Sequence, residues 1–111
     1  MSRFKNTLEF EKELSRLSRK YPSLPEDLKK LERLVVLNPV GMGTNFVTIH
    51  HSPTVKIVKT RLACKSLRSR AMRVIYAYHD TTVTFVYIEL YFKGDKENED
   101  RERISEYLKS L

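Results

Sequence analysis

The chain has 111 residues, of which 41% are hydrophobic and 32% charged, with three Gly and four Pro. This length and composition fit one globular domain, residues 1–111, and argue against long disordered segments. No run of about 18 apolar residues occurs and the N-terminus lacks a signal-peptide core, so we predict a cytoplasmic protein without a membrane span. The one cysteine, Cys64, excludes an internal disulfide and a multi-cysteine zinc site, and it is expected to be a small buried side chain.

The charge is concentrated in the middle of the chain. The formal net charge is +7, yet no acidic residue occurs between Glu32 and Asp80. The stretch KIVKTRLACKSLRSRAMRVIY at 56–76 holds seven Lys and Arg. Both ends of the chain instead mix the two signs, as solvated helix faces do. A basic middle region indicates a polyanionic partner such as nucleic acid.

Two helices are predicted in the N-terminal half, after a short strand at 2–6. Thr7 is expected to cap the first helix, and Pro22 ends it. Its apolar residues recur at helical spacing: Phe10, Leu14, Leu17 and Tyr21. Ser23 is expected to cap the second helix, which stops before Pro39. The buried stripe of that helix comprises Leu24, Leu28, Leu31, Leu34 and Val35.

A loop is predicted from 40 to 53, because VGMGTNFVTIHHSP holds two of the three glycines. His50 and His51 are adjacent there, and neighbours in sequence rarely provide the geometry of a metal site, so no metal is expected.

From Val55 onward the hydrophobic period changes to two. Strands are predicted at 55–63, 71–79 and 83–92, with a turn at Asp80–Thr82. The predicted fold is α+β, with two antiparallel helices packed on a mainly antiparallel twisted sheet and a short C-terminal helix. Alternation in the last strand assigns one set to the core: Val86, Ile88, Leu90 and Phe92. The other set is expected to face a groove or solvent: Phe85, Tyr87, Glu89 and Tyr91.

Three smaller features are expected to have no role in chemistry. Tyr76 and Tyr78 are expected to pack in or around the core. His79, beside the turn, is expected to be exposed. The acidic run DKENED at 95–100 predicts the solvated start of a helix, where carboxylates are favourable.

The strands also predict a basic face with aromatic rings between the charges. Five side chains are expected to converge on it: Lys59, Arg61, Arg73, Tyr87 and Tyr91. Cations neutralise phosphates and rings stack on unpaired bases, which favours single-stranded nucleic acid. RNA cleavage needs a base, cations and a proton donor, and Lys, Arg and Tyr supply all three without a metal. Alternatively, Arg61 and Arg73 form structural salt bridges with Glu89 and the C-terminal acids.

Four stretches together resemble the RelE/ParE toxin superfamily of toxin-antitoxin systems, particularly its RelE- and HigB-like branch. They are FEKELSRLSRKYPSLPEDLKKL at 10–31, NPVGMG at 38–43, VKTRLACKS to MRVIY within 58–76, and YIELYFKGDKENEDRERI at 87–104. The resemblance implies a β-α-α-β-β-β fold, often with a terminal helix. It also implies an endoribonuclease that cuts mRNA, commonly on the ribosome, needs no cofactor, and is neutralised by a partner antitoxin.

The resemblance assigns catalytic roles by position. Arg61 and Arg73 would hold the scissile phosphate, because guanidinium is always charged and binds two oxygens at once. Lys59 would stabilise charge or, with a lowered pKa, act as a base. Tyr91 would stack on a base or relay a proton. Lys93, and more weakly Asp95, complete this set.

The segment CKSLRSRAM at 64–72 departs from the family pattern, because many relatives have a glycine-rich turn there. Its basic residues would form an extended loop that touches messenger or ribosomal RNA. The full set of predicted RNA-binding residues is Lys56, Lys65, Arg68, Arg70 and Tyr87. Two alternatives remain open: a ParE-like inhibitor of DNA gyrase and a non-catalytic RNA-binding module. The cognate antitoxin is expected to cover the basic groove with an acidic or amphipathic segment.

Overall fold

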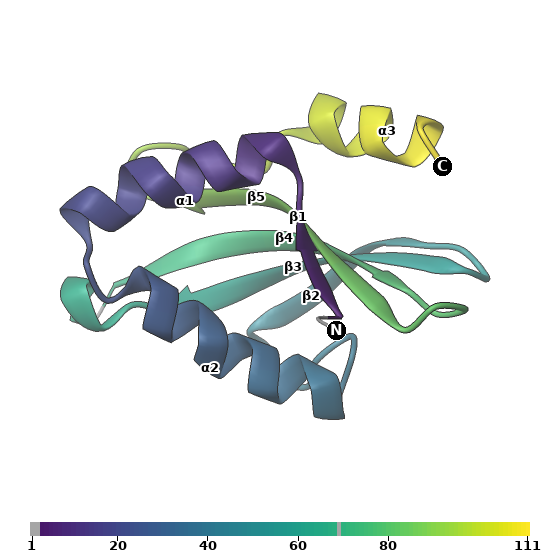
Figure 1. The fold of residues 1–111 in the computed structure, drawn as a ribbon, viewed down its shortest axis with the longest axis horizontal. Helices are drawn as coiled ribbons and strands as arrows, with labels where there is room; N and C mark the ends of the chain where they lie inside the picture. The colour runs from purple at the N-terminus through teal and green to yellow at the C-terminus, as the bar shows by residue number, and fades with distance from the viewer. Residues whose placement is uncertain (1–2, 69) are drawn as a thin grey trace.

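The computed structural model describes residues 3–68 and 70–111. Its elements are β1 (Phe4–Asn6), α1 (Leu8–Lys20), α2 (Leu24–Leu37), β2 (Phe46–His51), β3 (Val55–Ala63), the 3-10 turn η1 (Lys65–Leu67), β4 (Ala71–His79), β5 (Thr84–Phe92) and α3 (Arg101–Lys109) (Figure 1). The predicted α+β class and element order are confirmed, with one strand added between α2 and β3. Ser2, the first residue of the predicted strand at 2–6, lies outside the described residues.

Both N-terminal helices begin close to the predicted caps. Thr7 Oγ1 accepts a hydrogen bond from the Phe10 backbone N–H at 3.3 Å, as an N-cap should. Ser23 precedes α2 but does not cap it with its side chain. Its Oγ instead donates a hydrogen bond to Asp27 Oδ2 at 2.7 Å and accepts one from the Ser66 backbone N–H at 2.9 Å. The prediction of a Ser23 side-chain cap is therefore wrong, since this hydroxyl ties the start of α2 to the turn after β3.

The sheet has the strand order β1-β5-β4-β3-β2, with β1 parallel to β5 and the other neighbours antiparallel. The outer strand β2 corrects the prediction of a loop across 40–53. Phe46 lies opposite Thr60 and His51 opposite Lys56, so His50 and His51 belong to a strand. The glycines precede this strand, and Gly41 (φ 74°) lies so close to the Phe46 ring that a side chain there would collide with it.

The two faces of the sheet are covered differently. Helices α1 and α2 pack on the face that carries Val58, Val74 and Tyr76, which we call the helix face. On the opposite, open face, Ile104 of α3 packs against Ile57, Ile75, Ala77 and Ile88. Figure 1 shows α3 (yellow) beyond the end of α1 that is farther from α2. Among the described helices, none is long and apolar enough to cross a membrane.

A β-bulge at Ile88 reorders the faces of β5. Ile75 lies opposite Glu89 and Tyr76 lies opposite Tyr87, so Ile88 is the extra residue between them. Before the bulge, Tyr87 points to the helix face, where its ring stacks on Phe10 with centroids 4.7 Å apart. After the bulge, Glu89 and Tyr91 point to the open face. The predicted strict alternation is therefore wrong, and Phe85, Tyr87, Glu89 and Tyr91 are all buried.

Helices α1 and α3 cover the backbone edge of β5 beyond Tyr87, where its pairing with β1 ends. Arg103 Nη1 donates to the Ile88 carbonyl at 2.9 Å, and Glu13 Oε1 accepts the Leu90 N–H at 3.0 Å. The two side chains also pair with each other, with Arg103 Nη2 2.9 Å from Glu13 Oε2. This ion pair fixes α3 against α1.

His79 is not the exposed residue that was predicted. Its Nε2 lies 2.6 Å from Tyr107 Oη, which links β4 to α3. Burial lowers the pKa of His79. Cys64 and Tyr76 are buried as expected, and Tyr78 packs at the margin of the core.

Candidate functional site

Three neighbouring strands bring Arg61, Arg73 and Tyr91 into one row on the open face. Arg61 lies opposite Arg73, and Arg73 lies opposite Tyr91. The Arg61 N–H donates to the Asn45 carbonyl at 3.0 Å, away from β4. Arg61 and Arg73 are therefore a non-hydrogen-bonded pair, the kind in which opposite side chains lie closest. Like charges in this arrangement destabilise a sheet, and an anion bound between them removes that cost.

A cleft of about 350 Å³ lies over this part of the open face. Its cationic lining consists of Lys59, Arg61, Arg73 and Arg101, and its apolar wall consists of Val47 and Ile49 from β2. The predicted convergence of Lys59, Arg61, Arg73 and Tyr91 on one face therefore holds in the structure. This wall was not predicted, because Val47 and Ile49 belong to β2, which lies where a loop was expected.

Lys59 is held by a carboxylate from the C-terminal segment. Its Nζ lies 3.0 Å from Oε1 of Glu99, whose side chain is only 5% exposed. This hydrogen bond raises the pKa of Lys59, so the amine stays protonated. Burial opposes ionisation of Glu99, but the hydrogen bond and charge of Lys59 bring its pKa below the usual range. A raised pKa does not fit the suggestion that a lowered pKa makes Lys59 a base, and of this pair only the ionised carboxylate of Glu99 has a free position to accept a proton.

Tyr91 lies beneath the cleft with its ring buried. It is 4% exposed, and Lys96 Nζ lies 5.3 Å from the ring centroid. Its hydroxyl finds no hydrogen-bond partner among residues 3–68 and 70–111. Burial raises the pKa of Tyr91, against the opposing charge of Lys59, so the group is a neutral phenol near pH 7. Little ring surface remains for stacking on a base, which does not favour the predicted stacking role of Tyr91.

Arg73 is not held by an internal carboxylate in the part of the chain that the structure describes. It is half-buried, and its Nη1 donates to the Met72 carbonyl at 3.4 Å. The expected alternative partner, Glu89, is fully buried and pairs instead with Lys96. Glu89 Oε1 also accepts the Asp100 N–H at 2.8 Å. A structural salt bridge between Arg73 and Glu89 is therefore absent.

The acidic run at 95–100 is only partly the solvated helix start that was expected. Asp100 caps α3 by accepting the Arg103 N–H at 3.0 Å, in agreement with the prediction. Lys96 and Glu99, however, turn inward to Glu89 and Lys59. Glu99 and Arg101 thus contribute to the cleft, although the mixed charges of this segment resemble an ordinary surface.

Four predicted residues lie away from the cleft. Tyr87 is in the core and its hydroxyl donates to Glu32 at 3.1 Å, so the prediction that it faces a groove is wrong. Lys56 is on the helix face and pairs with Asp80 at the far end of β3. Lys93 is exposed in the turn after β5, as is Asp95, and neither lines the cleft.

The basic connection between β3 and β4 lies just beyond the Arg61–Arg73 end of the sheet. Lys65, Arg68 and Arg70 are exposed there, and the Arg70 guanidinium lies 5.1 Å from the Phe92 ring centroid. Arg68 adopts a φ of 59°, in the left-handed region that favours glycine. The turn is thus tight although it carries no glycine, and it places cations next to the cleft.

Comparisons with known proteins agree with this architecture. No protein-family model matches the sequence, and no curated protein is detectably similar to it. Among solved structures, a double arginine-to-alanine mutant of the E. coli toxin RelE in the free state superposes with a TM-score of 0.59. The match has 22% sequence identity and covers 97% of this chain and 95% of that one. The chain therefore has the RelE toxin fold, as its resemblance to the RelE/ParE superfamily implied.

Proposed function

We propose that this protein is the toxin of a toxin-antitoxin system and a metal-independent endoribonuclease that cuts mRNA on the ribosome. The observation that carries the proposal is the close cross-strand pair of Arg61 and Arg73 on an open, cationic cleft. Arginines that face each other across two strands can together bind the oxygens of one phosphate, because each guanidinium can donate two hydrogen bonds at once.

The reaction proposed is attack of a ribose 2′-oxygen on the adjacent phosphorus. A bond forms between the 2′-oxygen and phosphorus while the bond from phosphorus to the 5′-oxygen breaks, giving a 2′,3′-cyclic phosphate and a free 5′-hydroxyl. Arg61 and Arg73 stabilise the negative charge that develops on the phosphoryl oxygens. Lys59 stays protonated and faces the same cleft, so it adds to this field.

The protons have defined routes in this scheme. Glu99, kept ionised beside Lys59, takes the proton of the 2′-hydroxyl. Lys59 gives a proton to the departing 5′-oxygen, and the buried Tyr91 hydroxyl beside it supports the neutral amine. Transfer of one proton from Glu99 to Lys59 across their 3.0 Å contact then restores the starting state.

The test is to map cleavage sites on translating mRNA with the purified protein, in the presence of a metal chelator. The wild-type protein should cut, Arg73→Ala should not, and Arg19→Ala on the exposed surface of α1 should cut normally. Inhibition of gyrase supercoiling with intact RNA would assign the ParE-like activity instead. Salt-dependent binding to RNA without any cleavage would assign a binding module.

The proposed partner is an antitoxin that competes with RNA for the cleft. A cationic cleft attracts an acidic segment by the same charges that attract phosphate, so neutralisation and substrate binding would exclude each other.

A further inference from the structure

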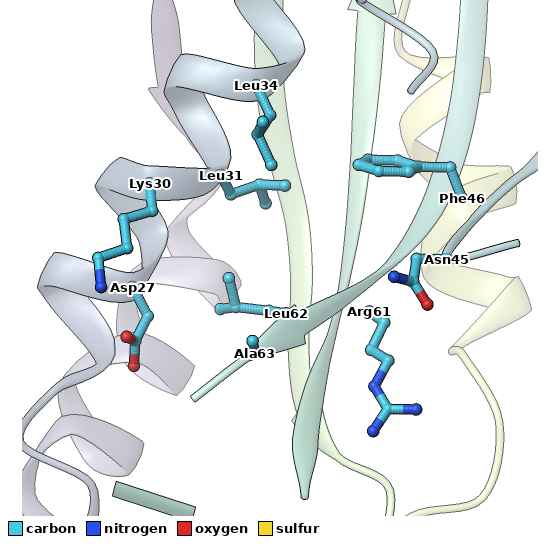
Figure 2. Close-up of a pocket in the computed structure, with 9 residues that line it drawn as sticks. All are labelled: Asp27, Lys30, Leu31, Leu34, Asn45, Phe46, Arg61, Leu62 and Ala63. Atoms are coloured by element: carbon cyan, nitrogen blue, oxygen red, sulfur yellow. The ribbon is translucent and has the colours of Figure 1, made fainter. Parts of the chain in front are cut away.

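A second cavity, of about 230 Å³, lies at the sheet edge where β3 runs past the start of β2 (Figure 2). Its walls are apolar and comprise Leu31 and Leu34 of α2, Phe46 of β2, and Leu62 and Ala63 of β3. Figure 2 shows the Phe46 ring extending across the cavity toward Leu34. Gly41 packs against this ring, which fixes its position.

This cavity borders the cationic cleft. Asn45 and Arg61 line both, so the apolar space begins at residues that also line the proposed phosphate site. A ligand with a phosphate at Arg61 and Arg73 would have its next group at the mouth of the cavity. Lys30 lies on the opposite rim and keeps the entrance cationic.

Polar groups in the cavity indicate an occupant with a hydrogen-bonding edge. Asp27 is 4% exposed, and within the described residues the two hydrogen bonds it accepts, from Ser23 and from the Lys65 N–H, end on Oδ2. Oδ1 can therefore accept a hydrogen bond from a ligand. The Arg61 N–H points toward β2, so two residues later the amide and carbonyl of Ala63 point the same way, beyond the first residue of β2. An aliphatic side chain would leave these groups unsatisfied, at a cost in affinity.

We propose that this cavity binds one nucleobase of the RNA, adjacent to the phosphate held by Arg61 and Arg73. The proposal rests on the nuclease function proposed above and names the subsite that selects the base. A base offers a flat apolar surface to Phe46 and the leucines, and a polar edge to Asp27, Asn45 and the Ala63 backbone. This combination of apolar faces and a polar rim is what the cavity presents.

The test fills the cavity and leaves Arg61, Arg73 and Tyr91 unchanged. Leu34 is 60% exposed, so the prediction that it belongs to the buried stripe of α2 is wrong. Leu34→Trp should therefore fold, and thermal unfolding would verify this. Leu37→Trp is the matched control, because Leu37 lies one turn further along α2, is 85% exposed, and does not line the cavity. Two readouts are needed: cleavage-site mapping on translating mRNA, and binding of short 2′-O-methyl RNAs in which one base at a time is removed.

In the wild-type protein and Leu37→Trp, removal of one particular base should weaken binding roughly tenfold, as expected for the loss of one stacked base. Leu34→Trp should bind the intact RNA about as weakly as the wild type binds that abasic RNA, and its cleavage sites should lose base preference at one position. Equal behaviour of Leu34→Trp and the wild type in both assays would overturn the subsite.

Two further outcomes are also decisive. If Leu34→Trp keeps its RNA selectivity but escapes neutralisation by the antitoxin, the cavity binds a protein side chain and the nucleobase assignment is wrong. If the wild type binds RNA with the expected dependence on one base but cuts none, the subsite stands and the nuclease function fails.

Discussion

Arg73→Ala separates a functional arginine from a structural one, because a functional arginine predicts lost activity with little change in stability and a structural one predicts a loss of stability. A guanidinium that stabilises charge in the transition state resembles an oxyanion-hole donor, whose removal costs about 2.7 to 4 kcal/mol. That loss corresponds to a decrease of about 10² to 10³ in the rate of RNA cleavage.

The stability of Arg73→Ala should change little. Arg73 makes one long hydrogen bond to a backbone carbonyl and lies opposite another arginine. Removing the repulsion gains about 0.2 to 1 kcal/mol, and losing the packing of the side-chain stem offsets part of that gain. The free energy of unfolding should therefore stay within about 1 kcal/mol of the wild-type value.

Urea denaturation and cleavage of translating mRNA measure the two quantities on the same preparations, with Arg19→Ala as the control for loss of a surface cation. Full cleavage activity in a folded Arg73→Ala protein would refute the assignment. A loss of stability well above 1 kcal/mol would also count against it, because it would mean that Arg73 holds the fold through a partner.

Three further predictions concern the scaffold. Glu89→Gln removes a fully buried charge that pairs with Lys96. Because Lys96 is 39% exposed, the free energy of unfolding measured by urea denaturation should decrease by about 1 to 3 kcal/mol. An unchanged midpoint would contradict this role. Val83 has a φ of 50°, which strains a β-branched residue, so Val83→Asn should raise the free energy of unfolding by about 1 kcal/mol, whereas a lower value would argue against strain. Burial lowers the pKa of His79 below its unfolded value of about 6.5, so the folded protein binds this proton less readily than the unfolded chain. The free energy of unfolding should therefore be highest above about pH 6.5 and should decrease at lower pH. His79→Phe should reduce that slope between about pH 6.5 and 5, and identical slopes would exclude a contribution from this residue.

The prediction of strict alternation along β5 was wrong for a specific physical reason. Counting by two along β5 cannot detect the extra residue at Ile88, because residues on both faces of this strand are buried and burial therefore does not alternate along it. The same shift that moves Tyr91 to the open face leaves Tyr87 in the core. The prediction that Arg73 and Tyr91 are neighbours held because both lie beyond the bulge, in regular pairing.

The missed strand β2 has a different cause. Its apolar residues Val47 and Ile49 project over the cleft instead of into the core, so they give no pattern of burial. Glycines just before it also favoured a loop. The inward-turned Glu99 was missed because a mixed-charge segment gives no sign of which carboxylate is buried. Residues that build the core were thus easier to predict than those that line the cleft.

The open face has two adjacent rows with opposite electrostatic character. In the row of Lys59, Ile75 and Glu89, each charge has a partner, because Glu99 reaches Lys59 and Lys96 reaches Glu89. In the row of Arg61, Arg73 and Tyr91, two cations lie side by side and, within the described residues, Arg73 forms no ion pair with a carboxylate. The first row therefore fastens the C-terminal segment over the sheet. In the proposed mechanism it also positions the proton-transfer pair, while the second row binds the phosphate. An RNA phosphate should accordingly lie nearer the Arg61–Arg73 pair than Lys59, at the end of the sheet that also carries the basic turn and the mouth of the apolar cavity.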